Sequence, residues 1–471
     1  MNVLSNTAVS RRVVFIVFIV VLSIGGLQPE PAFARDDGNP EHRRAALGTP
    51  PDVKHDGSSR AIEAEIRYGL DRSLPASERQ WLIENGEFIR SIKLSGRGVD
   101  DETLEAVAAV AGLETLHVFS GAISDTGVRH LRRLKSLHSL RLFDAEITGE
   151  TLGELVGLKR LSLTKCSISD RGIEAIARLP RLSELDLKET PVSDHSLAVL
   201  RSLWSLERLD VSNTEVTAAG LRNLSSLTNL VEISVPEMSG DDFADAMADC
   251  KSLEWFNGAF EFSDVGLQRL GKLKNLRSLY LTGNRMTEAG ISAIASLPRL
   301  GDLRIENARL SAPAWTALRT ARSIRQLGLY NVDSRVTDLD PLAEIDGLES
   351  LQIVDLPDGI GIASIAGKML GLRSLAIEGR GIDDEGLKEL AALKRLIHLS
   401  VRGSAVTDDG LQLISGLPNL ISLDIQDTRI TDMGIPSLLR LEHLSVVCLP
   451  ADITDRAKKS LQLTMPQLAI Q

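Results

Sequence analysis

Carboxylates are the side chains in this sequence that come closest to a pattern for chemistry. An Asp or Glu follows a Ser, Thr or Asp in eleven regularly spaced segments, for example at Asp125, Asp170, Asp194, Asp264, Asp432 and Asp455. Such a ladder could bind Ca²⁺, but calcium needs several oxygens that converge on one point. Here one carboxylate occurs per segment, at a predicted helix start, where the helix dipole favours negative charge. We therefore interpret the ladder as structural, including the pairs Asp100-Asp101, Asp241-Asp242, Asp383-Asp384 and Asp408-Asp409.

Catalytic motifs are missing from the sequence. Its eight histidines are dispersed, and no H-E-x-x-H, C-x-x-C, G-x-S-x-G or phosphate-binding glycine-rich loop occurs. The three cysteines, Cys166, Cys250 and Cys448, are widely separated and indicate no disulfide framework. We expect all three to be small buried side chains. The sequence thus predicts no enzyme, no metal site and no cofactor.

Binding is the chemistry that remains, and it is predicted for side chains that alternate with the leucines of an L-x-L pattern. With period two, these side chains point out of a sheet while the leucines point inward. They are His117, Phe119, Arg141 and Phe143 in early repeats, and Trp255, Asn257, Tyr280, Arg304 and Tyr330 in middle repeats. Trp, Tyr and Arg dominate interface hot spots. Because aromatic residues make up only 4% of the chain, we predict a partner-binding patch here, centred on the eighth to eleventh repeats. Trp204 and Trp315 fall in predicted helices and are expected to pack.

The pattern that positions these side chains repeats about every 24 residues from Ile89 onward, within the range of known short repeats. Good copies are LPRLSELDLKETPVSDHSLAVLRSL at 179–203 and LPNLISLDIQDTRITDMGIPSLLRL at 417–441. The position before the acidic residue is Ser, Thr or Asp in fifteen of sixteen copies, and these types cap helix starts. The residue before that position is apolar in all sixteen.

Each repeat therefore predicts one short strand and one helix, because the L-x-L part alternates and the G-L-x-x-L-x-x-L part has helical spacing. We predict an α/β solenoid of about sixteen repeats over residues 89–456. In this curved horseshoe a parallel sheet lies on the concave side and the helices on the convex side. A repeat cannot bury its leucines alone, but stacked repeats can.

The repeat resembles the leucine-rich-repeat family, and its I-[ST]-D-x-G-L signature is most similar to the cysteine-containing class of F-box adaptors and exported bacterial repeat proteins. Cys166 occupies that class's cysteine position, whereas Thr190, Thr214, Asn284 and Thr428 stand there in other repeats. No F-box precedes the repeats. The resemblance implies a non-catalytic scaffold that binds a protein partner; a substrate-recognition adaptor of the F-box kind is an alternative.

The N-terminal region has the pattern of an export signal. Arg11 and Arg12 precede an apolar run at 13–27, which is followed by Ala32-Phe33-Ala34. Residues 1–34 are thus predicted to be a signal peptide for the periplasm, envelope or exterior, with an uncleaved anchor as the alternative. Residues 35–60 are predicted to be a disordered linker. Residues 61–88 and 457–471 are predicted to be the two caps of the solenoid, the first of them helical.

Two irregular stretches and the net charge complete the prediction. Residues 236–262 and 330–365 depart from the repeat, and in the second Gly361 replaces the helix cap. Both functional loops and simple repeat decay are consistent with them. The net charge of −11 argues against broad nucleic-acid binding. An envelope polysaccharide is the alternative partner, stacked on Trp255, Tyr280 and Tyr330. A membrane contact is predicted only through an uncleaved signal.

Overall fold

The fold was obtained as a computed structural model, which describes residues 53–55, 62–67, 74–86, 89–257, 260–333, 336–355, 359–379 and 382–471. The described residues all belong to one compact unit, Pro50–Gln471. The predicted signal peptide at 1–34 lies outside them, as does most of the predicted linker.

Strands at the predicted positions pair with their sequence neighbours and form two ten-stranded sheets. The first sheet consists of β1 Val53–His55, β2 Ile62–Arg67, β3 Ile89–Ser95, β4 Thr115–Phe119, β5 Ser139–Phe143, β6 Arg160–Ser162, β7 Glu184–Asp186, β8 Arg208–Asp210, β9 Glu232–Ser234 and β10 Trp255–Asn257. The second consists of β11 Phe260–Glu261, β12 Ser278–Thr282, β13 Asp302–Glu306, β14 Gln326–Tyr330, β15 Ser350–Val354, β16 Ser374–Glu378, β17 His398–Ser400, β18 Ser422–Asp424, β19 Val446–Cys448 and β20 Ala469–Ile470. All pairs are parallel except β1 with β2.

A helix follows nearly every strand. The α-helices are α2 Ala76–Asn85, α3 Asp101–Val107, α4 Asp125–His130, α5 Asp170–Ile176, α6 Asp194–Leu200, α7 Ala218–Leu221, α8 Gly240–Met247, α9 Asp264–Leu270, α10 Glu288–Ala295, α11 Ala312–Leu318, α12 Gly359–Gly367, α13 Asp384–Leu390, α14 Asp408–Ile414 and α15 Asp455–Thr464. The 3-10 helices are η1 Leu131–Arg133, η2 Leu152–Glu154, η3 Arg222–Ser226, η4 Val336–Glu344 and η5 Ile435–Arg440.

The predicted cap residue is the N-cap of the following helix in twelve repeats. Thr148 and Thr431 are exceptions, because the next helices are 3-10 helices that begin later, at Leu152 and Ile435. Thr337 and Gly361 lie inside η4 and α12 rather than before them. Helix starts are therefore as predicted in twelve of the sixteen repeats, and the exceptions include Thr431 in the good copy at 417–441.

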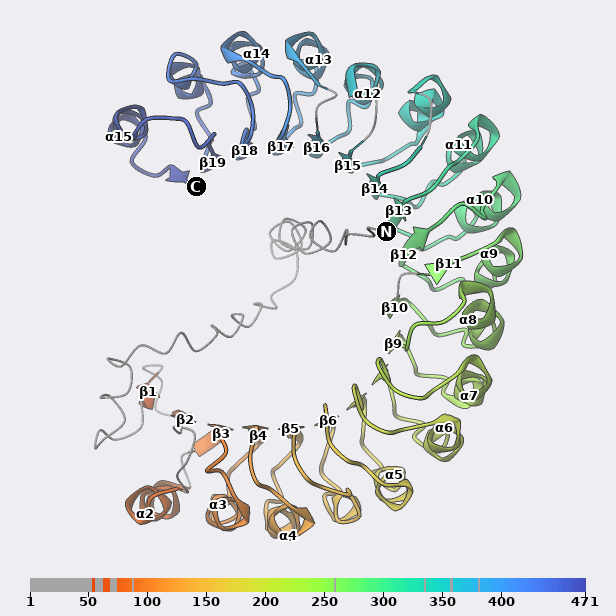
Figure 1. The fold of residues 1–471 in the computed structure, drawn as a ribbon, viewed down its shortest axis with the longest axis vertical. Helices are drawn as coiled ribbons and strands as arrows, with labels where there is room; N and C mark the ends of the chain where they lie inside the picture. Colours follow the sequence, from red (N-terminus) through yellow and green to blue (C-terminus); the bar gives the residue numbers. More distant parts are fainter. Residues whose placement is uncertain are drawn as a thin grey trace, which may run out of the picture. The chain divides into compact units, whose positions relative to one another are not determined.

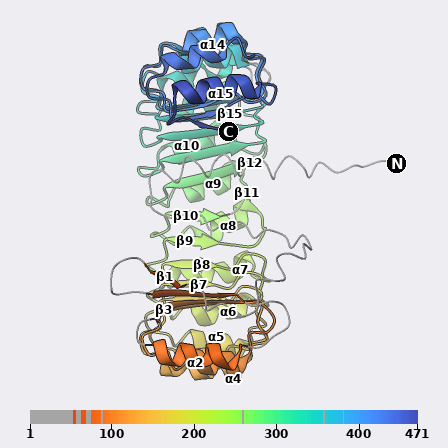
Figure 2. The same cartoon turned by 90° about the vertical axis from the view of Figure 1, so that its left-hand side faces the viewer.

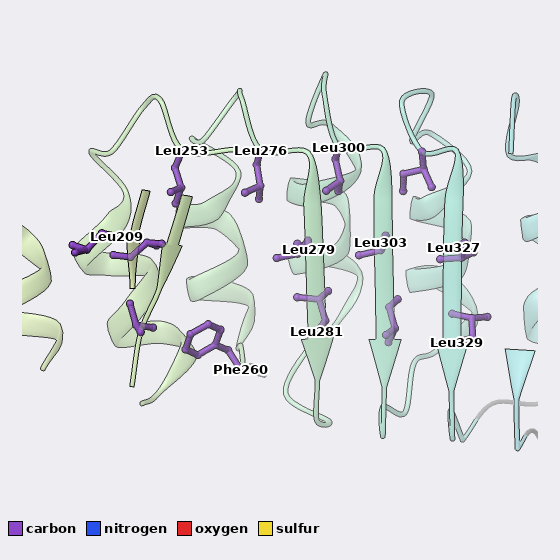
Figure 3. Packing of buried hydrophobic residues seen from close by; sticks show 14 of the residues in the cluster. Leu209, Leu253, Phe260, Leu276, Leu279, Leu281, Leu300, Leu303, Leu327 and Leu329 are labelled. Carbon is purple, nitrogen blue, oxygen red and sulfur yellow. The ribbon is translucent and has the colours of Figure 1, made fainter. Parts of the chain in front are cut away.

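Strands and helices form two layers with the leucines between them, strands on the inner side of the curve and helices on the outer side (Figure 1). Figure 2 shows the strands as successive parallel rungs. Parallel strands lie about 4.8 Å apart, whereas packed helices need about 8–10 Å, so the sheet side is concave. Leu161, Leu185 and Leu209 on neighbouring strands are each 2% exposed, and Figure 3 shows the same stacking around Leu279, Leu303 and Leu327.

The first irregular stretch interrupts the sheet. Phe256 pairs with the first sheet and Phe260 with the second. Four positions separate the half-buried Phe256 from the buried Phe260, whereas two separate Leu279 and Leu281 in the next repeat (Figure 3). The larger rings of this repeat fill the core: Phe243 stacks on Phe260 with ring centroids 4.6 Å apart and lies 4.8 Å from Phe256.

Eight aspartates of the predicted ladder link one repeat to the next, a role that their sequence position did not reveal. Asp194 accepts hydrogen bonds from the backbone N–H and the hydroxyl of Thr217, both at 2.7 Å. We call this arrangement the clasp. It recurs, with one carboxylate holding the N–H and hydroxyl of the next Ser or Thr, at Asp101–Ser124, Asp125–Thr148, Asp241–Ser263, Asp264–Thr287, Asp384–Thr407, Asp408–Thr431 and Asp432–Thr454.

The glycine column of the repeat makes room for the clasp. A Cβ at Gly220 would lie within the van der Waals radius of the Asp194 carboxylate, and the same holds for Gly410 and Asp384. In these repeats a glycine gives room where the carboxylate of one repeat meets the helix of the next. Thr151 and Ala457 stand in the same column at the Asp125–Thr148 and Asp432–Thr454 clasps, so the clasp also forms without glycine.

The ends of the described part differ from expectation. β1 and β2 form an antiparallel pair, although the sequence predicted a disordered linker over the first of them and no strand over the second. Within the predicted helical cap at 61–88, the helix is α2, Ala76–Asn85. At the C-terminal end, β20 adds a last parallel strand beside β19.

Candidate binding site

The strand face of the first sheet presents polar side chains in columns, because parallel strands in register place equivalent positions side by side. One column runs through Arg160, Glu184, Arg208, Glu232 and Trp255 on β6 to β10. Its charges alternate, and Arg208 forms an ion pair with Glu184. Trp255, at the end of the column, has 43% of its surface exposed.

A shallow groove of about 610 Å³ lies along these columns. It is lined by side chains from β4 to β10, including the predicted residues His117, Arg141 and Asn257. Asp186 on its floor accepts hydrogen bonds from the hydroxyls of Ser162, at 2.8 Å, and Thr164, at 2.9 Å. The groove is therefore lined by both positively and negatively charged side chains.

Aromatic and cationic side chains collect on β3 to β5 and just beyond β6. His117 meets Phe119 edge to face, with ring centroids 6.4 Å apart, and Phe119 lies 6.4 Å from Phe143. The Nζ atom of Lys93 is 5.5 Å from the Phe119 ring centre, and Lys165 approaches Phe143 to 5.3 Å. All five side chains are half-buried or exposed. We call these five side chains the aromatic platform. Its two lysines, Lys93 and Lys165, were not among the residues predicted from the sequence.

The middle-repeat residues are divided between the two sheets. Trp255 and Asn257 end the first sheet, where the Asn257 amide donates to the Ser234 hydroxyl at 3.0 Å. Tyr280 lies in the second sheet, in a separate groove of about 500 Å³. Arg304 pairs with Asp302 at 3.5 Å. The predicted patch is thus interrupted between β10 and β11.

Tyr330 is not an exposed contact residue, contrary to the prediction. Only 9% of its surface is exposed, and its hydroxyl donates to Gln352 Oε1 at 2.8 Å. The ring lies over Gly328, where a Cβ would come within 2.8 Å of it. Burial raises the pKa of Tyr330 to about 12. Tyr330 therefore lies covered on the strand face of the second sheet, and its ring is not available for a partner to stack on.

Trp204, Trp315 and the three cysteines were all predicted to be buried, and the structure confirms this for only some of them. Trp315 is fully buried, as predicted, but Trp204 is 67% exposed in the turn between α6 and β8. Cys166 and Cys250 are buried, whereas Cys448 is only half-buried on β19. Burial raises the pKa of each of the three thiols to about 11.

Carboxylates do not converge on any cation site within the part of the chain that the structure describes. Burial would raise the pKa of Asp241, but hydrogen bonds from Ser263 and the charge of Arg285 lower it below its ordinary value. In the second sheet, burial raises the pKa of Glu378 and of Asp424 on the strand face.

Among the described helices, none has the length and apolar character needed to cross a membrane.

Family comparison agrees with this architecture. The family described as leucine-rich repeat region matches residues 112–364, more than half of the chain. The chain belongs to the leucine-rich-repeat family. Its two sheets with alternating helices are the solenoid predicted from the sequence, whereas the cysteine-containing subclass stays a prediction. No curated protein matches this leucine-rich-repeat sequence.

Solved structures of similar fold come from several leucine-rich-repeat proteins. An internalin from Listeria monocytogenes is 21% identical over 78% of this chain and 88% of its own, with a TM-score of 0.42. A leucine-rich-repeat protein from Leptospira interrogans is 16% identical over 91% of this chain and 97% of its own, with a TM-score of 0.44. TLR13 in complex with ssRNA13 is 18% identical over 85% of this chain and 64% of its own, with a TM-score of 0.53. At these identities the likeness concerns the fold.

Proposed function

We propose that this protein is an exported, non-catalytic scaffold that binds a protein partner on the strand face of its first sheet. The observation that carries the proposal is the column from Arg160 to Trp255, where charges alternate along the groove and end at an exposed tryptophan. Leucine-rich repeats commonly serve as binding scaffolds, and extended concave surfaces are the usual binding surfaces of solenoids. Export rests on the sequence pattern of residues 1–34.

A protein surface fits this column better than a polyanion does. Successive positions are about 4.8 Å apart, so alternating charges can pair with acidic and basic side chains of a partner that lies across the strands. TLR13 is solved with ssRNA13. In the chain described here, however, Glu184, Asp186, Asp210 and Glu232 line the groove, and their charges would repel phosphates.

Trp255 and the aromatic platform supply the apolar contacts. A large ring at the end of a polar column is typical of an interface hot spot, which contributes most when a partner covers it fully. The platform lies in the same sheet, on β3 to β5 and just beyond β6. A partner that spans the groove can therefore reach both Trp255 and the platform. Tyr280 and the second groove lie beyond the interruption and are an accessory surface in this proposal.

The test is site-specific photocrosslinking with a benzophenone amino acid in place of Trp255, in the full chain in its native compartment. A crosslinked protein would be identified, purified and titrated against the unchanged chain. Trp255→Ala should then weaken binding by about thirtyfold, because truncating a hot-spot residue costs about 2 kcal/mol or more. Trp204→Ala is the matched control, since it removes a tryptophan that is more exposed than Trp255 but lies away from the strand face.

Three results would contradict the proposal. Equal affinities of the Trp255→Ala variant and the unchanged chain would show that the column is not the binding surface. Recovery of no protein, together with binding of the purified chain to an envelope glycan on an array, would show that the partner is a polysaccharide. A catalytic turnover in activity screens would contradict the non-catalytic assignment.

A further inference from the structure

Exposed basic side chains collect on one edge of the repeat stack, where each helix ends and the chain turns into the next strand. In the segments 131–138, 154–159, 177–183 and 201–207 they are Arg132, Arg133, Lys135, Lys159, Arg178, Arg181 and Arg201. The acidic residues of these four segments are Glu154, which pairs with Arg132 at 3.3 Å, and Glu207. We call these segments the basic edge. It is locally cationic although the chain carries a net charge of −11.

A row of apolar side chains lies within the basic edge. Val156, Pro180 and Trp204 occupy the same position in three successive repeats, directly after a buried leucine, and all three are exposed. Val156 is 59% exposed, and Trp204, at 67%, is the most exposed of the four tryptophans.

Hydrogen bonds fix the backbone under this row. The Ser205 hydroxyl donates to the carbonyl oxygen of Pro180 at 3.2 Å, and the Asn229 amide donates to the carbonyl oxygen of Trp204 at 2.9 Å. The turns are thus held in place while their apolar side chains face solvent. Leaving a tryptophan, a valine and a proline exposed side by side is unfavourable, and such patches mark interaction sites.

We propose that the basic edge docks on an anionic membrane surface, with Trp204, Val156 and Pro180 in the headgroup region and the arginines against lipid phosphates. Tryptophan is enriched at membrane–water interfaces because its ring has both apolar and polar parts. Clusters of Lys and Arg are attracted to anionic lipids. The charge of the edge and the character of its apolar row are therefore both those of an interfacial segment.

The shape and chemistry of the row favour a membrane over other anionic partners. The row lies on the turns at one edge of the stack, with Val156 59% and Trp204 67% exposed, whereas the two grooves described above lie on the strand face. An exposed apolar row outside any groove suits insertion into a deformable surface. Single-stranded nucleic acid is bound by stacking successive bases on aromatic rings, but the row contains one aromatic ring beside two aliphatic side chains.

The first test measures binding of the full chain to vesicles of phosphatidylcholine with about 30% phosphatidylglycerol, and to vesicles of phosphatidylcholine alone, by flotation at low salt. The apolar run at 13–27 contributes to both, so the difference between the vesicles is the readout. The double variant Arg178→Gln/Arg181→Gln should lose about thirtyfold in affinity for the anionic vesicles, at about fivefold per charge near the surface. Lys394→Gln/Arg395→Gln removes two charges from the same turn of a repeat outside the row and should leave the affinity unchanged.

The second test places Trp204 in the bilayer. Brominated phosphatidylcholine in the anionic vesicles quenches nearby tryptophan fluorescence, and the difference between the full chain and its Trp204→Phe variant isolates this residue. We expect this difference to be quenched, whereas the corresponding difference for Trp255→Phe should not be.

Three results would overturn the proposal: equal binding to both vesicle types, equal loss in the two double variants, or an unquenched Trp204. Binding to heparin with the same dependence on Arg178 and Arg181 but without quenching of Trp204 would identify a soluble polyanion as the partner instead. None of these results bears on the strand face, which the Trp255→Ala variant tests separately.

Discussion

Because of the clasp, we expect one glycine-to-alanine substitution in a helix to destabilise the chain, although alanine usually favours a helix over glycine. Gly410 lies inside α14, where replacing glycine by alanine normally stabilises a helix by about 1 kcal/mol. A methyl group at this position, however, would overlap the carboxylate of Asp384, which holds the N–H of Thr407 at 2.8 Å and its hydroxyl at 2.6 Å. We therefore expect Gly410→Ala to destabilise the chain.

The magnitude follows from the bonds that the methyl group would displace. Two hydrogen bonds to a charged acceptor contribute about 1.5 kcal/mol each at the low end, about 3 kcal/mol in total. Subtracting the gain in helix propensity leaves a loss of about 2 kcal/mol for Gly410→Ala. Asp384→Ala should cost about 3 kcal/mol, and the double variant about 2 kcal/mol, because the same two bonds are lost only once.

The assay is urea unfolding followed by far-ultraviolet circular dichroism, together with hydrogen exchange of the peptide that contains Thr407. Gly416→Ala is the matched control, since this glycine lies just after the same helix and no atom lies within 4 Å of an added Cβ. It should change stability by less than about 0.5 kcal/mol. A Gly410→Ala variant as stable as the control, or additive losses in the double variant, would refute the reasoning.

Three further predictions concern titration and reactivity. Hydrogen bonds from Thr454 lower the pKa of Asp432 in the folded chain, so its contribution to stability is present above about pH 4 and is lost as the pH falls through the lowered value. Asp432→Asn should thus reduce the acid-induced fall in the urea midpoint, and an unchanged fall would contradict this. Gly328→Ala should displace the ring of Tyr330 and return its pKa from about 12 towards 10, as measured by the ultraviolet absorbance of the phenolate; a titration identical to that of the unchanged chain would show that the ring stays covered. Of the three thiols only that of Cys448 should react with a maleimide before unfolding, because the other two are buried; mass spectrometry locates the adduct, and early modification elsewhere would be inconsistent with the packing.

The solenoid could be predicted from sequence because its signals are local and repeated. An apolar residue followed by a capping residue marks each helix start, and Ser169 and Thr217 cap the helices as expected. The same signal failed at Thr431, where Pro436 lies at the start of η5 and the 3-10 helix begins four residues later. Local signals give the order of elements but not which helical form each repeat adopts.

The binding face could be predicted only in part, because exposure depends on neighbouring strands. Alternation identifies Trp255 and Tyr330 equally as outward-pointing residues. Tyr330 is nevertheless covered, because its ring lies over Gly328 on the same strand and its hydroxyl bonds to Gln352 on the next strand. Trp204 was misassigned because helical spacing continues beyond the last residue of α6. The clasp was missed since its partners lie about one repeat apart and no single segment shows both.

The interruption between β10 and β11 breaks the strand ladder without separating the repeats on either side of it. No ladder pair among the described strands joins the first sheet to the second. On the helix side, the clasp from Asp241 to Ser263 crosses the interruption, and the stacked rings of Phe243 and Phe260 fill the core beneath it. Just ahead of the strands, the backbone N–H of Arg277 donates to the carbonyl oxygen of Glu254 at 2.9 Å, and their side chains form an ion pair at 2.7 Å. The repeats on either side are therefore joined both ahead of the strands and on the helix side, so a partner that lies across both sheets meets one continuous row of repeats with a break only in its strand ladder.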